Sequence, residues 1–288
     1  MTSSEIIHSS KEIEDLLTNS SLSLDNLKYL AKEVSANSWS PYSKFPVGAV
    51  AVGIDQSKNL KVFSGTNVEP TVSQAVCAER VAIFNGITAG YKKFIALAVC
   101  CPKALEKNQP ELNKLTPCGA CREVILQKVD LKGLILIDGV ERTFTPKELL
   151  PHPILDPNKL KSLTIEEMDT LELARLALHN AHVPYSKEKY GVALLGENTK
   201  EKFFATTLDS TAFDCSVEPL KSVFGAYVAG GNLKNKIKAI VFAFPFVKYP
   251  PGDALQLISD YCDPKIKIII DNMGVTTIEE LLPWAFKL

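Results

Sequence analysis

The sequence has almost no excess charge of either sign and no long hydrophobic run. Its 288 residues carry a formal net charge of −1, whereas proteins that bind nucleic-acid phosphates normally need a basic face. No stretch approaches the roughly 18 apolar residues of a transmembrane helix. Residues 1–8 lack the basic and apolar regions of a signal peptide. We therefore expect a cytoplasmic protein with no nucleic acid and no membrane among its partners.

Seven cysteines make an odd total, and three of them stand in two short motifs. The first motif is Cys-Ala-Glu-Arg at residues 77–80, and the second is Pro-Cys-Gly-Ala-Cys-Arg at residues 117–122. A catalytic Zn²⁺ takes about three protein ligands and leaves a fourth position for water, whose pKa falls toward roughly 7. Three thiolates also require a reducing compartment. The spacing predicts a zinc ion bound by Cys77, Cys118 and Cys121.

The neighbours of these cysteines suit a reaction at the metal. Glu79 comes two residues after Cys77, about 200° around a helix, so it points away from the metal and is placed to carry protons. Arg80 and Arg122 each adjoin a key residue and would offset the negative charge of three thiolates. A Cys-x-x-Cys pair alone is more often a structural zinc site or a redox pair. The upstream Cys-Ala-Glu favours catalysis.

These motifs resemble the zinc deaminase signature, which is Cys-x-Glu followed by Pro-Cys-x-x-Cys. Two further segments extend the resemblance, SPYSKFPVGA at residues 40–49 and GTNVE at residues 65–69. Residues 26–154 are closely similar to cytidine deaminase, the nucleoside enzyme of pyrimidine salvage. The resemblance implies hydrolysis of cytidine and 2′-deoxycytidine to uridine and 2′-deoxyuridine, with release of ammonia and with Glu79 as the catalytic proton carrier.

The resemblance also implies a set of substrate-binding residues. Asn67 and Glu69 are similar to the pair that binds the ribose 3′-hydroxyl, and Phe45 to the ring that packs against the base. Val68 and Ala78 belong to the same motifs and are included in the substrate site. A carboxylate at Glu69 would repel a phosphate, which favours a nucleoside over a nucleotide.

The order of the expected elements predicts an α/β protein. Apolar spacing predicts a helix over residues 27–37 and strands over residues 46–53 and 60–68, joined by a polar turn. Strands at residues 94–100 and 134–137 then alternate with helices that carry the two cysteine motifs. This order indicates a mixed sheet with helices on both faces. The resemblance implies the same three-layer α/β/α fold.

The second half of the chain repeats the first. Residues 173–175, 184–187 and 191–193 match residues 30–32, 41–44 and 48–50 at a constant offset of 143. This pattern predicts a tandem duplication. The domains that we expect are an N-terminal helical extension (1–24), a catalytic zinc deaminase domain (25–154), a linker (155–164) and a degenerate, non-catalytic deaminase-like domain (165–288).

The second copy lacks the three zinc ligands. Its counterparts are Ser216, Val217 and Glu218 for residues 77–79, Pro251 and Ala254 for Cys118 and Cys121, Thr207 and Asp209 for Asn67 and Glu69, and Glu188 for Phe45. Cys215 lies one residue before the position opposite Cys77. We therefore expect one Zn²⁺ per chain, in the N-terminal domain.

The tandem arrangement resembles the dimeric branch of the cytidine deaminases, which implies a homodimer. That branch commonly has His as its first ligand, whereas Cys77 with Arg80 is the pattern of the short tetrameric enzymes. Trp284 and Phe286 are candidates to reach across an interface. Two alternatives stay open: another small-substrate zinc deaminase, such as a blasticidin S or nucleotide deaminase, and a zinc-stabilised scaffold without turnover.

Overall fold

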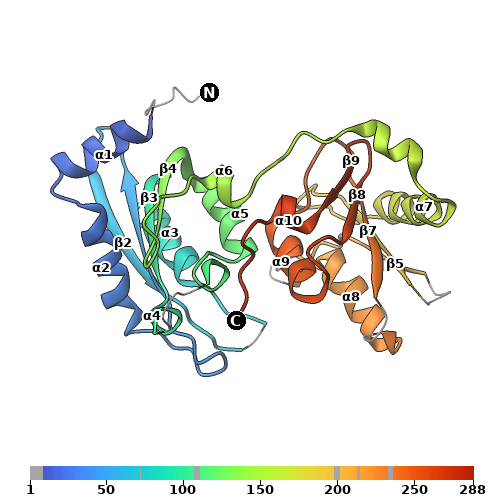
Figure 1. The fold of residues 1–288 in the computed structure, drawn as a ribbon, viewed down its shortest axis with the longest axis horizontal. Coiled ribbons are helices and arrows are strands. Elements are labelled where there is room, and N and C mark those ends of the chain that lie inside the picture. Colours follow the sequence, from blue (N-terminus) through green and yellow to red (C-terminus); the bar gives the residue numbers. More distant parts are fainter. Residues whose placement is uncertain (1–8, 72, 107–110, 198–201, 213–214, 233–235) are drawn as a thin grey trace. The chain divides into compact units, whose positions relative to one another are not determined.

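A computed structural model describes residues 9–71, 73–106, 111–197, 202–212, 215–232 and 236–288. The chain forms two compact units, each with its own sheet (Figure 1). The first unit combines Met1–Pro151 with Trp284–Leu288, and the second is His152–Pro283. Residues 1–8 of the expected N-terminal extension lie outside the described residues.

The first unit contains a four-stranded mixed sheet in the order β2-β1-β3-β4. Its strands are β1 (Gly48–Ile54), β2 (Leu60–Thr66), β3 (Lys93–Cys100) and β4 (Val129–Ile137). β1 is antiparallel to β2 and β3, and β3 is parallel to β4. Every residue of β1 is buried, because helices cover both faces of the sheet.

Two helices lie against each face of this sheet. α1 (Ser10–Asn19) and α2 (Leu24–Ser35) pack on one face, and α3 (Ala78–Thr88) and α5 (Gly119–Lys128) on the other. The short elements are α4 (Pro102–Leu105), η1 (Leu112–Lys114) and α6 (Pro146–Leu149). The α/β class and the three-layer arrangement predicted from the sequence are confirmed.

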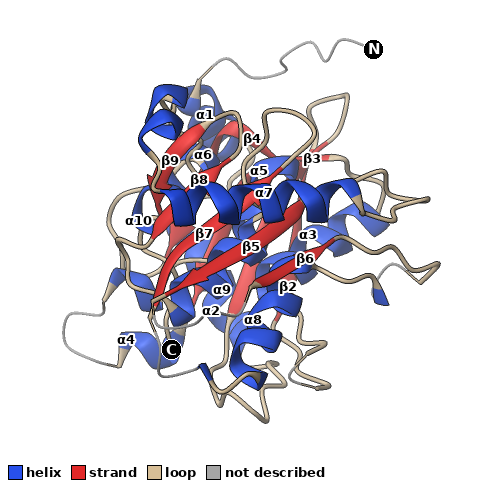
Figure 2. Cartoon of the chain, turned by 90° about the vertical axis from the view of Figure 1, so that its right-hand side faces the viewer, coloured by secondary structure: helices blue, strands red, loops and turns tan. Residues whose placement is uncertain are grey.

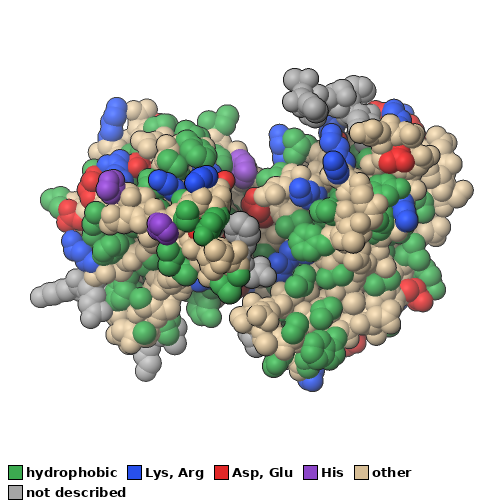
Figure 3. Space-filling view, turned by 180° about the vertical axis from the view of Figure 1, so that it is seen from behind, with side chains coloured by type: hydrophobic (Ala, Val, Ile, Leu, Met, Phe, Trp, Pro, Cys, Tyr) green, Lys and Arg blue, Asp and Glu red, His purple; other side chains and the backbone are tan. Residues whose placement is uncertain are grey.

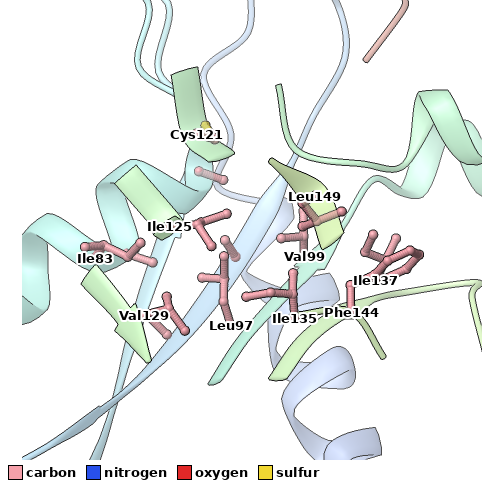
Figure 4. Packing of buried hydrophobic residues seen from close by; sticks show 14 of the residues in the cluster. Ile83, Leu97, Val99, Cys121, Ile125, Val129, Ile135, Ile137, Phe144 and Leu149 are labelled. Atoms are coloured by element: carbon pink, nitrogen blue, oxygen red, sulfur yellow. The ribbon is translucent and has the colours of Figure 1, made fainter. Parts of the chain in front are cut away.

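An apolar cluster fills the space between the sheet and the pair α3 and α5. Ile83 of α3 and Ile125 of α5 are fully buried there against Leu97 and Ile135 of the sheet. Figure 4 shows the side chain of Cys121 at the edge of this cluster. Dense packing of this kind resists movement, so the core holds Cys121 in a defined position.

The second unit repeats this plan with an additional strand, in the order β6-β5-β7-β8-β9. β5 is antiparallel to β6 and β7, and β7 is parallel to β8. Figure 2 shows α7 along one face of this sheet. The elements are η2 (Pro157–Ser162), α7 (Ile165–His179), β5 (Gly191–Gly196), β6 (Phe203–Thr206), α8 (Pro219–Ala229), β7 (Ile237–Ala243), α9 (Gly252–Tyr261), β8 (Lys267–Ile270), β9 (Gly274–Thr277) and α10 (Ile278–Leu281).

A repeated glycine explains part of the sequence duplication. A Cβ atom on Gly48 would lie 2.0 Å from the carbonyl oxygen of Ala31, and one on Gly191 would lie 2.1 Å from that of Ala174. At this glycine α2 crosses β1 in the first unit and α7 crosses β5 in the second. Any larger residue would force the helix away from the sheet, so both copies need glycine here.

None of the helices in the described residues combines the length and the hydrophobicity that crossing a bilayer requires. On the face drawn in Figure 3, basic and acidic side chains are interspersed among apolar and neutral ones.

Candidate active site

Three cysteine sulfurs meet at the start of two helices. Cys77 is the N-cap of α3 and Cys118 is the N-cap of α5, while Cys121 lies in the first turn of α5. The three Sγ atoms lie within 4.8 Å of one another. Neither N-cap cysteine makes a side-chain capping bond, so both sulfurs are available to another partner at the positive ends of the helices.

The geometry of the cluster fits zinc. The Sγ atoms of Cys77 and Cys118 are 3.7 Å apart, and the edge of a tetrahedron with Zn–S bonds of about 2.3 Å is about 3.8 Å. Burial raises the pKa of Cys121, whereas hydrogen bonds from the Cys121 and Cys77 thiols lower that of Cys118. Ionisation of the Cys118 thiol thus opposes ionisation of the Cys121 thiol, unless a cation binds between the sulfurs. The donor set therefore suits Zn²⁺.

Glu79 lines a pocket beside the cysteine cluster. The residue is only 4% exposed and lines the pocket together with Cys77 and Cys118. Burial and the negative charge of Cys77 together raise the pKa of the Glu79 carboxyl to about 7. A carboxyl in this range both accepts and donates a proton near neutral pH.

Arg80 interacts directly with the sulfur cluster. Its Nη2 donates to the Sγ of Cys77 at 3.8 Å and to the carbonyl of Ala75 at 3.3 Å. Burial alone would lower the pKa of Arg80, but the nearby charges of Cys121 and Cys77 raise it. This guanidinium is thus the positive group that faces the thiolates.

Arg122 uses its donors differently. It is fully buried, and it donates to the backbone carbonyls of Pro117, Leu149 and Trp284, each at 2.7 Å. Burial lowers the pKa of Arg122 to about 10, so the side chain stays charged at neutral pH. Arg122 therefore holds three backbone segments together around the metal helix.

Replacing Arg122 by methionine should lower the free energy of unfolding of the first unit by about 3 kcal/mol. The change removes the Arg122 donor from three carbonyls, of which that of Trp284 keeps its bond from Thr116 Oγ1; each buried group left unsatisfied costs about 1–3 kcal/mol, partly offset because no charge is then buried. Urea unfolding followed by circular dichroism measures the difference. Lys147→Met, at an exposed lysine of α6, is the control and should change stability by less than about 0.5 kcal/mol. Equal effects of both changes would refute this role.

Asn67 and Glu69 form a hydrogen-bonded group on the wall of the pocket. Asn67 Oδ1 accepts from the Val47 amide at 2.8 Å, and its Nδ2 donates to the Phe45 carbonyl at 3.0 Å. The Glu69 carboxylate accepts from the hydroxyl of Ser43 at 2.6 Å and from the Ser43 amide at 3.1 Å. Asn67 thus positions the loop that carries Phe45, whereas Glu69 also accepts from the Tyr42 amide at 3.1 Å and from Asn67 Nδ2 at 3.5 Å and still lines the pocket.

The pocket has an empty volume of about 600 Å³, which includes space open to solvent. Phe45, Asn67, Glu69, Cys77, Glu79 and Cys118 line it. Val68 and Ala78 do not. Val68 exchanges two backbone hydrogen bonds with Val76, and Ala78 is fully buried.

Sequence reasoning did not place several other lining residues. Ser43 lies in residues 40–49, one of the segments that carry the resemblance, so its motif could have indicated a place in the site. Its hydrogen bond to Glu69 could not be predicted from the sequence. Cys101 and Thr116 lie next to recognised segments without any distinguishing pattern. Phe286 and Leu288 line the pocket more than 160 residues beyond the second cysteine motif, and no spacing rule points to them.

The second unit places a carboxylate at the position of the first cysteine. The bridge between Leu208 and Val217 corresponds to the bridge between Val68 and Val76, and the next residue, Glu218, is the N-cap of α8. The alignment of Ser216 with Cys77 was therefore wrong. The loop before α8 is one residue longer than its counterpart before α3, which shifts the register.

Aromatic rings occupy the corresponding space in the second unit. Tyr190 precedes β5 as Val47 precedes β1, and Phe244 follows β7 as Cys101 follows β3. The Tyr190 and Phe244 rings stack at 5.3 Å, and the Tyr190 hydroxyl donates to Glu218 at 2.5 Å. Two larger side chains thus replace two that line the first pocket.

Two family models, both described as the cytidine and deoxycytidylate deaminase zinc-binding region, match residues 23–135 and 140–244. Together they span well over half of the chain. The chain belongs to the cytidine and deoxycytidylate deaminase family. The predictions of this family, of a zinc cofactor and of a zinc-dependent deaminase are confirmed.

Curated relatives agree with this assignment. A cytidine deaminase of Serratia proteamaculans is 29% identical over 225 residues, which cover 73% of this chain and 70% of that protein. A cytidine deaminase of Sporosarcina psychrophila is 37% identical over 98 residues, or 34% of this chain and 63% of that protein. This chain therefore spans less than two thirds of the second relative.

Solved structures are also similar to part of the chain. A crystal structure of cytidine deaminase from Burkholderia pseudomallei is 29% identical with a TM-score of 0.38, and covers 45% of this chain and 98% of that chain. One from Mycobacterium leprae is 22% identical with a TM-score of 0.37, and covers 42% and 99%.

Proposed function

We propose that this deaminase converts the free nucleosides cytidine and 2′-deoxycytidine to uridine and 2′-deoxyuridine, using the first unit alone. The observation that carries the proposal is the position of Glu79. Its buried carboxyl lines the same pocket as two cysteines of the zinc-ligand set and as Glu69. A nucleoside bound there could contact Glu79 with its base and Glu69 with its sugar.

Cys77, Cys118 and Cys121 would hold the zinc ion, which would supply a water of lowered pKa as the nucleophile for C4 of the cytosine ring. Glu79 would carry one proton of the attacking water to N3 of the base and would then carry the remaining hydroxyl proton at C4 to the amine, which leaves as ammonia. Arg80 donates to the Cys77 sulfur throughout and so balances the negative charge of the ligand set. Glu79 is the only one of these groups that must change its protonation state.

Glu69 is proposed to bind the ribose 3′-hydroxyl, with Asn67 and Ser43 positioning it. Burial alone would raise the pKa of Glu69, but the hydrogen bonds from Ser43 and Tyr42 lower it below the ordinary value. The stabilising contribution of these bonds is present above the unfolded pKa of about 4.3 and is lost as the pH falls through the lower folded pKa. Near neutral pH Glu69 is therefore an anion, which disfavours a substrate phosphate.

Glu69→Gln should lower kcat/KM for cytidine by about tenfold, since a hydrogen bond to a charged acceptor contributes about 1.5–3 kcal/mol. The same change should reduce the ratio of kcat/KM for cytidine to kcat/KM for cytidine monophosphate, because the negative charge that disfavours the phosphate is removed. Asp209→Asn is the matched control, because Asp209 accepts the equivalent bonds from Tyr185 and Ser186 in the second unit. The fall in ultraviolet absorbance measures both rates. An unchanged cytidine rate in Glu69→Gln, or an equal loss in Asp209→Asn, would count against this assignment.

We also propose that the protein is a cytoplasmic homodimer and binds no nucleic acid. The tandem arrangement supports the dimer, and the interspersed charges on the face in Figure 3 fit the absence of a nucleic-acid partner. Light scattering on the purified chain measures the assembly; a monomeric mass at micromolar concentration would refute the dimer. A zinc-stabilised scaffold without turnover is the remaining alternative, and the absorbance assay distinguishes it directly.

A further inference from the structure

The segment Trp284–Leu288 belongs to the first unit, although the second unit precedes it in the chain. Phe286 and Leu288 line the pocket that contains Glu79. The Phe286 ring meets the Phe45 ring edge-on, with centroids 5.9 Å apart. The position of this segment therefore helps to determine the shape of the pocket.

The Trp284 side chain is attached to the first unit through an aromatic and cationic stack. Its ring lies 5.7 Å from that of Phe144, which is buried. The Arg142 guanidinium lies over both rings, 4.0 Å from the Phe144 centroid and 5.2 Å from the Trp284 centroid. Glu148 pairs with Arg142 at 3.3 Å and holds it in this place. Cation–π contacts of this kind stabilise by about 0.5–1 kcal/mol at exposed sites.

The backbone of Trp284 is bound to the loop that presents the second pair of cysteines. Its carbonyl accepts from Thr116 Oγ1 and from Arg122 Nη2, both at 2.7 Å. Both donors are buried, and Thr116 also lines the pocket. Trp284 has a φ of +48°, a left-handed conformation that is uncommon for a residue other than glycine. The surrounding contacts hold it in this conformation.

A second attachment lies on the other side of Phe286. The amide of Lys287 donates to the carbonyl of Asn113 at 3.0 Å. Phe286 is thus held between two backbone attachments, one at Trp284 and one at Lys287. Such a short segment has little freedom, so a change at Trp284 is transmitted to the pocket wall.

We propose that Trp284 is a positioning residue for substrate binding, which acts by holding Phe286 and Leu288 against the pocket. This inference rests on the proposed function, because the affected substrate is the nucleoside. Trp284 itself does not line the pocket. When its anchor is lost, the segment must be ordered at the moment of binding, and that ordering weakens substrate affinity.

Trp284→Ala should raise KM for cytidine about tenfold, with kcat within about threefold and the zinc content unchanged. A rise in KM at constant kcat reports lost ground-state binding. Phe286→Ala should raise KM as well, and the double variant should be no worse than the stronger single variant, because both changes remove the same wall. Phe246→Ala, at an exposed phenylalanine of the second unit, is the control and should leave KM unchanged.

A fluorescence measurement tests the anchor without turnover. The chain has two tryptophans, so Trp39→Phe leaves Trp284 as the only tryptophan, which is excited selectively at wavelengths that tyrosine does not absorb. In that background Arg142→Ala should at least double quenching by acrylamide, and added uridine should reduce quenching in the parent. Unchanged quenching in Arg142→Ala, additive KM effects in the double variant, or a loss of zinc without a change in KM would each overturn the inference. If the wild-type protein does not convert cytidine, the proposed function fails, whereas the quenching still decides whether Arg142 holds Trp284.

Discussion

Glu79→Gln should lower kcat for cytidine by about 10³–10⁴-fold while zinc stays bound. A positioned acid–base group contributes about 10²–10⁴-fold, and Glu79 is proposed to act in more than one proton transfer. Glutamine has nearly the same shape, so the buried position stays filled and the cysteine cluster is undisturbed. Single-turnover absorbance measurements with metal analysis of the same sample test both parts of this expectation.

The control for Glu79 is a glutamate on the other metal helix. Glu123 lies on α5 two residues after Cys121 and accepts a hydrogen bond from Gln127 at 3.0 Å. It does not line the pocket. Glu123→Gln should therefore keep kcat within about twofold. A near-normal rate in Glu79→Gln would refute the role of Glu79, and loss of zinc in that variant would show a structural effect instead.

Cys121→Ser should reduce the zinc content from one ion per chain to less than about a tenth of an ion, and should reduce activity by about 10⁴-fold. Two sulfurs are left for an ion that takes four ligands in structural sites and three protein ligands in catalytic ones. Serine has a similar size, so the packing beside Ile125 is largely kept. Because metal binding is coupled to folding, the first unit should also become less stable. Atomic absorption and thermal unfolding measure these effects.

An exposed cysteine provides the matched control for this change. Cys215 lies in the second unit and is exposed, so Cys215→Ser should retain one zinc ion and full activity. The zinc content of the wild-type protein is a further test. Two zinc ions per chain would contradict the proposal that only the first unit binds metal, as would loss of zinc in Cys215→Ser.

Several features of this protein follow from local sequence alone. The ligand spacing in residues 77–80 and 117–122 identified the zinc site, because both motifs place sulfurs at helix starts where neighbours in sequence are neighbours in space. Apolar periodicity similarly predicted the helix over residues 27–37 and the four strands of the first unit. The constant offset of 143 revealed the duplication, since the same close contact of helix and strand requires glycine at both Gly48 and Gly191.

Only the tertiary structure decided the contacts between residues that are distant in sequence. Arg122 is adjacent to Cys121 in the chain, yet its guanidinium binds the carbonyls of Leu149 and Trp284. Glu218, rather than Ser216, occupies the place of Cys77. The loop before α8 is one residue longer than the loop before α3, and this length determines which residue follows the β-bridge. Such partners are selected by packing and by the need to satisfy buried polar groups. Sequence spacing carries no information about them, whereas it does carry the pattern of each helix, strand and metal motif.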